Sequence, residues 1–149
     1  IIREHDRPTQ YKVGGGAVIS GRPDGKVRGF RDTRYTPPWL LELKTTQDYQ
    51  LHRLNTWEDI RHAQQHYVRA YYDQGQVYCL LEDLPHGLIV FKGKGSGWMK
   101  MIPFDLDFGY AEQILQRVEY LQGLVSAGTD PPPIPYDVSI CGRCAFGHI

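Results

Sequence analysis

The segment Trp39-Leu40-Leu41-Glu42-Leu43-Lys44-Thr45-Thr46 predicts a β-strand with a charged pair in an apolar run. Alternate side chains of a strand share a face, so Glu42 and Lys44 should project together while Leu43 turns inward. A solvated ion pair of this kind contributes well under about 1 kcal/mol and is common. Leucines on both sides of Glu42 favour a more specific role, because burying a charge without a partner is costly.

An upstream apolar run, Val18–Ser20, leads to Asp24 through a turn. Pairing of this run with Trp39–Leu43 as a neighbouring strand would bring Asp24 beside Glu42. Two carboxylates at a sheet end are what Mg²⁺ needs, because it prefers oxygen ligands and usually takes one or two carboxylates from protein. The sequence therefore predicts a divalent-cation site at this place.

Three segments together resemble the PD-(D/E)xK nuclease superfamily, and within it the RecB-like exonuclease group that includes phage and CRISPR-adaptation nucleases. Ser20–Gly25 is similar to the Gly-x-x-Asp end of one core strand, and Leu41–Thr46 to the Glu-x-Lys strand. Ile60–Tyr67 is similar to the Gln/Tyr motif on the next helix, although that motif is usually Gln-x-x-x-Tyr. The resemblance implies an α/β fold: a restriction-endonuclease-like core with a central mixed β-sheet flanked by helices.

The resemblance also implies a set of site residues. Asp24 and Glu42 would hold Mg²⁺ or Mn²⁺, with the backbone carbonyl of Leu43 as an extra ligand. Lys44 would orient the attacking water or stabilise the pentacovalent phosphorus. Two helical residues would lie beside the site and position the lysine or a phosphate. The implied catalytic residues are Asp24, Glu42, Lys44, Gln64 and Tyr67.

The formal net charge is zero, which excludes a globally basic nucleic-acid binder. A local positive groove remains compatible with a neutral total. The bend between the two predicted strands is the clearest basic cluster, and Lys94 in a glycine-rich turn resembles a late-strand lysine of the same family. The alternative for both is a loop made soluble by its charges. The residues predicted to contact DNA phosphates are Arg22, Lys26, Arg28, Arg31 and Lys94.

Further elements follow from periodicity and turn signals. Tyr11–Ser20 should be a strand interrupted by a bulge at three glycines, and the last helix should be capped by Gly128. The other predicted elements are a helix from Trp57 to about Gln74 that Gly75 ends, strands at Val77–Leu81, Gly87–Phe91 and Trp98–Pro103, and a helix at Tyr110–Ser126.

Composition and length fit one domain over residues 1–129, followed by a proline-rich connector and a Cys-x-x-Cys tail over 130–149. Cys141 and Cys144 form the half-site of a structural zinc or an iron–sulfur cluster, which needs further ligands from a longer chain. The pair is therefore either a truncated cluster site or a relic, and His148 is a weak candidate for a third ligand. Cys79 is expected as a buried apolar residue in a core strand. The first residue is Ile1, which suggests a fragment.

The functional expectation is a Mg²⁺- or Mn²⁺-dependent deoxyribonuclease, of the exonuclease type that the resemblance implies. The implied location is the cytoplasm of a bacterial or phage-infected cell, with a protein partner in a recombination, repair or phage replication complex. No apolar run reaches the roughly 18 residues of a membrane span, and no secretory leader is visible. The alternatives are a catalytically inactive nucleic-acid-binding module on the same fold, and a metal-cluster module built on the terminal cysteines.

Overall fold

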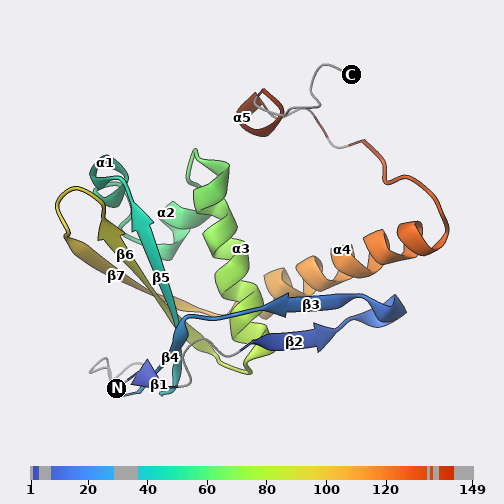
Figure 1. The fold of residues 1–149 in the computed structure, drawn as a ribbon, viewed down its shortest axis with the longest axis horizontal. Helices are drawn as coiled ribbons and strands as arrows, with labels where there is room; N and C mark the ends of the chain where they lie inside the picture. The colour runs from blue at the N-terminus through green and yellow to red at the C-terminus, as the bar shows by residue number, and fades with distance from the viewer. Residues whose placement is uncertain (1, 4–7, 29–36, 134, 136–137, 143–149) are drawn as a thin grey trace.

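A mixed five-stranded sheet forms the centre of the molecule, with strand order β1-β4-β5-β6-β7. The computed structural model describes residues 2–3, 8–28, 37–133, 135 and 138–142 (Figure 1). The strands are β1 (Ile2–Arg3), β2 (Thr9–Lys12), β3 (Val18–Gly21), β4 (Gly25–Val27), β5 (Trp39–Thr46), β6 (His86–Gly93) and β7 (Met99–Asp105). The helices are α1 (Asp48–Leu51), α2 (Trp57–Arg61), α3 (His66–Leu81), α4 (Phe108–Ser126) and α5 (Val138–Cys141), with a 3₁₀ turn, η1, at Gly14–Gly16.

The two central strands, β5 and β6, run parallel, and the other pairs in this sheet are antiparallel. A parallel pair requires a crossover, which α1, α2 and α3 supply. Strand β5 is buried on both faces at its start: Leu40 lies in the cluster under α3, and Leu41 packs with Trp39 and Leu88 on the opposite face. The expected α/β architecture with a central mixed sheet and flanking helices is confirmed.

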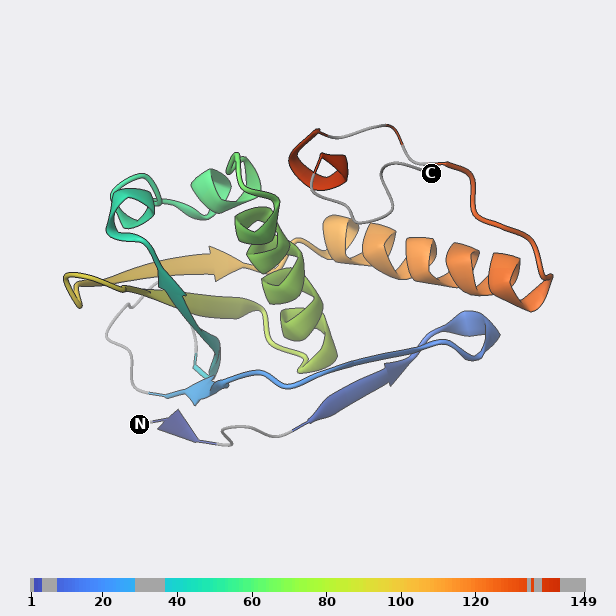
Figure 2. The ribbon, with the colours of Figure 1, turned by 45° about the horizontal axis from the view of Figure 1, so that its top comes forward.

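Helix α3 lies across one face of the sheet and packs against it in the main core (Figures 1 and 2). Val68, Tyr72 and Cys79 of this helix are buried together with Ile89 and Phe91 of β6. Their spacing of four and seven residues keeps them on one helical face. Fully burying each such side chain contributes about 1.5–3 kcal/mol relative to exposure, so this interface holds the helix against the strands that carry the candidate site.

The predicted helix from Trp57 to Gln74 is two helices. Helix α2 ends at Arg61, and α3 begins at His66 after a short turn. Arg69 stabilises this turn, because its Nη1 donates to the backbone carbonyls of Ala63 and Gln64 at 2.9 and 3.0 Å.

The predicted stop at Gly75 and the predicted strand Val77–Leu81 are both wrong, because α3 continues to Leu81. A Cβ at Gly75 would lie 2.7 Å from Cη2 of Trp57 and 3.0 Å from Cζ of Phe104. The glycine therefore permits close packing rather than a helix end. The short apolar run after it is compatible with a buried helix as well as a strand, and periodicity does not distinguish the two.

The residues around Gly14–Gly16 form a hairpin rather than a bulged strand. Strands β2 and β3 pair antiparallel in a separate two-stranded sheet, and η1 turns the chain between them. Gly15 and Gly16 have positive φ angles of 74° and 89°, which glycine adopts readily. The hairpin runs beside α4, away from the central sheet (Figure 2), and the backbone N–H of Gly14 donates to Oε1 of Glu119 at 2.9 Å.

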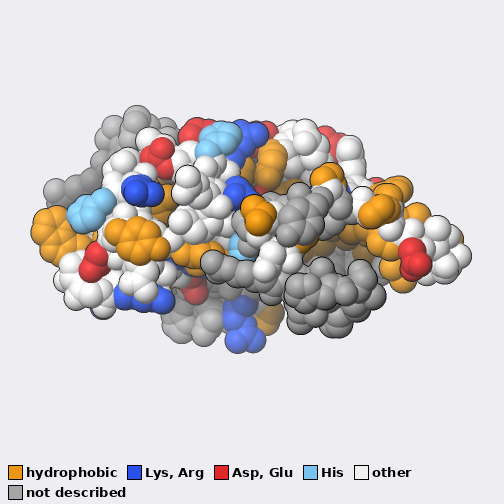
Figure 3. Space-filling view, turned by 90° about the horizontal axis from the view of Figure 1, so that it is seen from above, with side chains coloured by type: hydrophobic (Ala, Val, Ile, Leu, Met, Phe, Trp, Pro, Cys, Tyr) orange, Lys and Arg blue, Asp and Glu red, His pale blue; other side chains and the backbone are white. Residues whose placement is uncertain are grey.

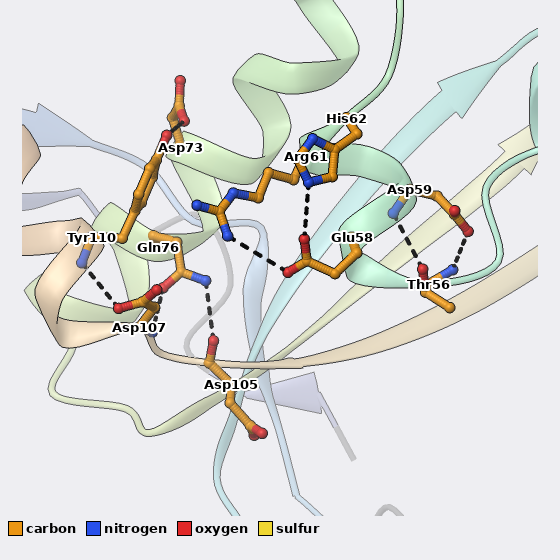
Figure 4. Close-up of polar contacts among 10 residues, drawn as sticks. All are labelled: Thr56, Glu58, Asp59, Arg61, His62, Asp73, Gln76, Asp105, Asp107 and Tyr110. Atoms are coloured by element: carbon orange, nitrogen blue, oxygen red, sulfur yellow. Dashed lines mark hydrogen bonds and ion pairs between the residues drawn. The ribbon is translucent and has the colours of Figure 1, made fainter.

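A buried amide fixes the turn between β7 and α4 to α3 (Figure 4). Nε2 of Gln76 donates to the Asp105 carbonyl at 3.0 Å, and its Oε1 accepts from the backbone N–H of Asp107 at 2.7 Å. Tyr110 Oη donates to Asp73 at 2.6 Å and makes a second link to α3. The predicted helix Tyr110–Ser126 is confirmed and begins two residues earlier, because Asp107 caps it.

Strands β6 and β7 confirm the predicted strands Gly87–Phe91 and Trp98–Pro103 to within two residues at each end. Trp98 itself lies in the turn that precedes β7. Within the described residues, no helix combines the length and the apolar character needed to cross a bilayer.

Candidate active site

The candidate site lies where β4 begins beside β5. Gly25, the first residue of β4, pairs with Leu41, so the residue before the strand, Asp24, falls level with Glu42. The backbone N–H of Leu43 donates to Oδ2 of Asp24 at 2.7 Å. The predicted approach of Asp24 to the Glu42 strand is therefore present. The predicted pairing of Val18–Ser20 with β5 is wrong, because that run pairs with β2 and the short strand β4 takes its place.

Glu42 is a buried carboxylate with one oxygen left over. Its side chain projects with Lys44 as expected, and Lys44 Nζ donates to Oε2 at 2.7 Å. The residue is only 2% exposed, and Oε1 has no hydrogen-bond partner among the described residues. Burial raises the pKa of Glu42 above its ordinary value, the Lys44 hydrogen bond and charge lower it, and the Asp24 charge raises it again. An orphaned buried oxygen of this kind requires an explanation, such as a bound cation.

Tyr71 completes the surroundings of Lys44. Lys44 Nζ lies 5.3 Å from the centroid of the Tyr71 ring, within cation–π distance. No sequence motif singles out Tyr71. Its position one helical turn after Tyr67 was the available signal, because residues four apart share a helical face.

Tyr67 lies near the site, but its partner is not the predicted Gln64. Gln64 lies in the turn before α3, so the expectation that it is a helical residue is wrong. Gln50 on α1 takes the place, because its Nε2 donates to the Tyr67 hydroxyl at 2.5 Å. Its Oε1 accepts from Thr46 Oγ1 at 2.6 Å, at the end of β5. Gln50 is buried, and the short distance along the chain from Lys44 was the only sequence signal for it.

Leu43 does not turn into the core, which corrects the expected inward side chain. It is 51% exposed, because it lies on the face of β5 opposite α3, beyond the small cluster of Trp39, Leu41 and Leu88. The N–H and C=O of one strand residue leave the strand on the same side. Since its N–H bonds Asp24, the Leu43 carbonyl faces the edge where the carboxylate lies.

The residues predicted to contact DNA have different surroundings. Lys26 Nζ pairs with Glu82 Oε2 at 2.8 Å, so its charge is already neutralised within the protein. Arg22 and Arg28 are exposed at the ends of the segment that carries Asp24, and Lys94 is exposed at the β6–β7 turn. Arg31 lies outside the described residues.

The two cysteines that the structure describes, Cys79 and Cys141, both lie in helices. Cys141 is at the end of α5, and Cys144 lies outside the described residues, as does His148. Cys79 is buried as expected but in helix α3 rather than in a strand, and burial raises the pKa of its thiol.

The donor set at the site is small and consists of oxygen. Among the described residues, no three His, Cys, Asp or Glu side chains gather into a preformed metal centre. Asp24 and Glu42 supply two carboxylates and Leu43 supplies a carbonyl, which suits a hard cation that keeps several waters. Oε1 of buried Glu42, which no described residue hydrogen-bonds, is the feature that fits such an ion.

Comparison with known proteins supports the fold alone. No protein-family model and no curated protein matches this chain. A solved structure described as "Crystal structure of SSO0001" is similar to it, with a TM-score of 0.55 and 19% sequence identity. The match covers 98% of this chain and 59% of the other, so this chain spans less than two thirds of the length of that structure.

Proposed function

We propose that this protein is a Mg²⁺- or Mn²⁺-dependent nuclease that hydrolyses DNA phosphodiester bonds on a restriction-endonuclease-like core. The observation that carries the proposal is the buried Glu42, whose Oε1 has no hydrogen-bond partner in the described part of the chain while Oε2 accepts from Lys44. Asp24 lies across the same strand edge. A carboxylate pair with an adjacent amine is the arrangement expected of the PD-(D/E)xK nucleases, and an exonuclease of the RecB-like group is the finer form of the proposal.

Asp24, Glu42 and the Leu43 carbonyl would hold the cation. A bound divalent ion lowers the pKa of water and offsets the negative charge that grows on the phosphate. Asp24 already accepts a hydrogen bond from the Leu43 backbone, which ties this carboxylate to β5. Side chains held in this way need little reorganisation when they act, which is the main source of such electrostatic stabilisation.

Lys44 supplies the positive charge next to the carboxylates. Its side chain is 15% exposed, and it lies between Glu42 and the face of Tyr71. This position lets the ammonium orient a water or bind a phosphate oxygen. Gln50 and Tyr67 hold the end of β5 against α3 and act as positioning residues, because each contacts the strand or its support rather than the carboxylates.

The central test is metal-dependent cleavage of linear DNA by purified variants. Asp24→Ala, Glu42→Ala and Lys44→Ala should each lower the cleavage rate by at least about 100-fold, with unchanged circular dichroism. Lys12→Ala, an exposed strand residue in the β2–β3 hairpin, is the matched control for Lys44 and should cleave normally. A chelator should stop the wild type. Cleavage retained by the Asp24 and Lys44 variants would refute this centre, and salt-sensitive binding without turnover would identify an inactive binding module.

A further inference from the structure

One end of the molecule exposes aromatic side chains that its core does not use. Trp98, in the turn between β6 and β7, is 72% exposed, and Tyr49 on α1 is 59% exposed. Figure 3 shows hydrophobic side chains together with basic and histidine side chains at this end, on the left of the view. Tryptophan exposed to this degree contributes little to folding and is typical of binding surfaces.

The turn that carries Trp98 is fixed to α1. Asp48 uses both carboxylate oxygens on Ser96: Oδ2 accepts from the backbone N–H at 3.0 Å, and Oδ1 accepts from the hydroxyl at 2.8 Å. A Cβ at Gly93 or Gly95 would lie 2.2 or 2.5 Å from these oxygens, so glycine at both positions permits the contact. The exposed ring of Trp98 therefore projects from a well-anchored turn.

A hollow of about 280 Å³ adjoins the Trp98 ring. Leu51 is buried and gives the hollow an apolar surface, while His52 is exposed beside it. The Asp48 charge faces Ser96, which satisfies both of its oxygens. A flat ring could be bound against Trp98 in this space. The lining residues are Asp48, Leu51, His52, Ser96 and Trp98.

Two lysines give the platform the charge that nucleic acid requires. Lys92 is exposed near the end of β6 and Lys94 is exposed in the turn that carries Ser96, and the backbone N–H of Lys94 donates to the Thr46 carbonyl at 2.9 Å. Thr46 follows Lys44 by two residues, about 7 Å along the strand. The platform is thus joined directly to the strand of the candidate active site.

We propose that Trp98, Tyr49 and His52, with Lys92 and Lys94, form a stacking platform for unpaired bases of single-stranded DNA. The proposal rests on the nuclease function and deepens it, because it states that the DNA bound outside the cleavage centre is single-stranded. A duplex hides the faces of its bases in its own stack, whereas a single strand offers them to aromatic rings. An apolar protein partner would gain nothing from the lysines, whereas phosphates pair with them.

The first experiment measures binding of a fluorescent single-stranded oligonucleotide in the presence of a chelator, so that no cleavage occurs. Trp98→Ala should weaken binding about tenfold, and Trp98→Tyr should restore most of the affinity because it keeps an aromatic face. Phe108→Ala is the matched control, since Phe108 is an exposed aromatic residue at the start of α4. Equal affinity of wild type and Trp98→Ala, or equal loss in the Phe108 variant, would overturn the platform.

A second experiment separates stacking from charge. An oligonucleotide with abasic sites keeps its phosphates but lacks bases that can stack. Wild type should therefore bind it more weakly than the normal strand, whereas Trp98→Ala should bind the two strands with equal affinity. A Lys92→Ala/Lys94→Ala variant should keep the preference for bases, and its log Kd against log salt slope should fall by about 1.4. A wild type that does not distinguish the abasic strand contradicts stacking, and loss of duplex binding alone by Trp98→Ala would do so too.

The platform and the cleavage centre fail independently. Lys44→Ala should keep the wild-type preference for the normal strand over the abasic strand, because that preference depends on Trp98, while cleavage is lost. If the wild type binds through Trp98 but never cleaves, the nuclease proposal fails and the platform stands. If it cleaves and Trp98→Ala binds and cleaves normally, the platform fails and the nuclease proposal stands.

Discussion

Glu42 shows how a single residue can be unfavourable for folding and useful for chemistry. Its carboxyl is buried beside a second carboxylate, and Lys44 compensates only one oxygen. A group that stability alone had selected would be paired on both sides, because burying a partly paired charge is costly. A divalent cation bound at Oε1 would compensate the charge that Lys44 leaves unpaired.

The raised pKa of Glu42 predicts how stability changes with pH. The folded protein holds this proton more tightly than the unfolded chain, whose pKa is near the ordinary 4.5. The contribution to stability is therefore fully present below pH 4.5 and is lost as pH rises through the folded pKa. Glu42→Gln cannot ionise, so it should melt higher than wild type at pH 7.5, by roughly a few degrees, and by less at pH 4. Melting curves from pH 4 to 7.5 with a chelator present measure this.

Adding Mn²⁺ provides the second half of this prediction. The wild type should gain thermal stability, because binding to the folded state alone stabilises it, and Glu42→Gln should gain much less. Glu112→Gln, at an exposed site on α4, is the control and should follow the wild type at every pH. A Glu42→Gln protein that melts below wild type at pH 7.5 would show that the Lys44 ion pair outweighs burial.

Helix α3 shows that a glycine can be required inside an element rather than at its end. Gly75 lies under the rings of Trp57 and Phe104, which stack with centroids 3.9 Å apart and an interplanar angle of 7°. This packing joins α2, α3 and β7. Intrinsic propensity at this position is therefore less important than the space available.

Gly75→Ala should destabilise the protein by about 1–3 kcal/mol, because the added methyl group overpacks the aromatic stack. Gly123→Ala in α4 is the matched control: none of the residues that the structure describes lies within 4 Å of its added Cβ, so it should stabilise by up to about 1 kcal/mol. Urea unfolding of both variants measures the sign of each change in the free energy of unfolding. A stabilised Gly75→Ala protein would mean that the rings move aside without cost.

For the molecule as a whole, local patterns predict the chemistry of each segment better than they predict its partners. The strand with Glu42 and Lys44 is predictable because alternation acts within eight residues. The pairing of β4 rather than Val18–Ser20 with β5 is not predictable from local patterns, because the choice of partner strand depends on contacts that are distant in the sequence. The position of Gln50 rather than Gln64 beside Tyr67 is unpredictable for a related reason. The break before α3 depends on the hydrogen bonds from Arg69 to the backbone carbonyls of Ala63 and Gln64.

The two parts of the molecule differ in how much they bury. Helix α3 has six buried residues in sixteen, whereas the nineteen-residue helix α4 has only Ala111. Helix α4 and the β2–β3 hairpin extend together away from the sheet (Figure 2). Segments with few buried apolar contacts open locally with a lower free energy than the core. The sheet with α3 should therefore be the most stable unit.

Hydrogen exchange should reveal this division. Backbone amides of β5, β6 and α3 should exchange slowest, near the rate of global unfolding, because opening them disrupts the core. Amides in the second half of α4, from Leu121 to Ser126, should exchange at least about tenfold faster, although they are helical and hydrogen-bonded. Peptide-level mass spectrometry at several times of labelling measures this, with α3 as the internal reference for a buried helix. Equal protection of α3 and α4 would mean that α4 is held as firmly as the core, and the division of the molecule into two units of different stability would be wrong.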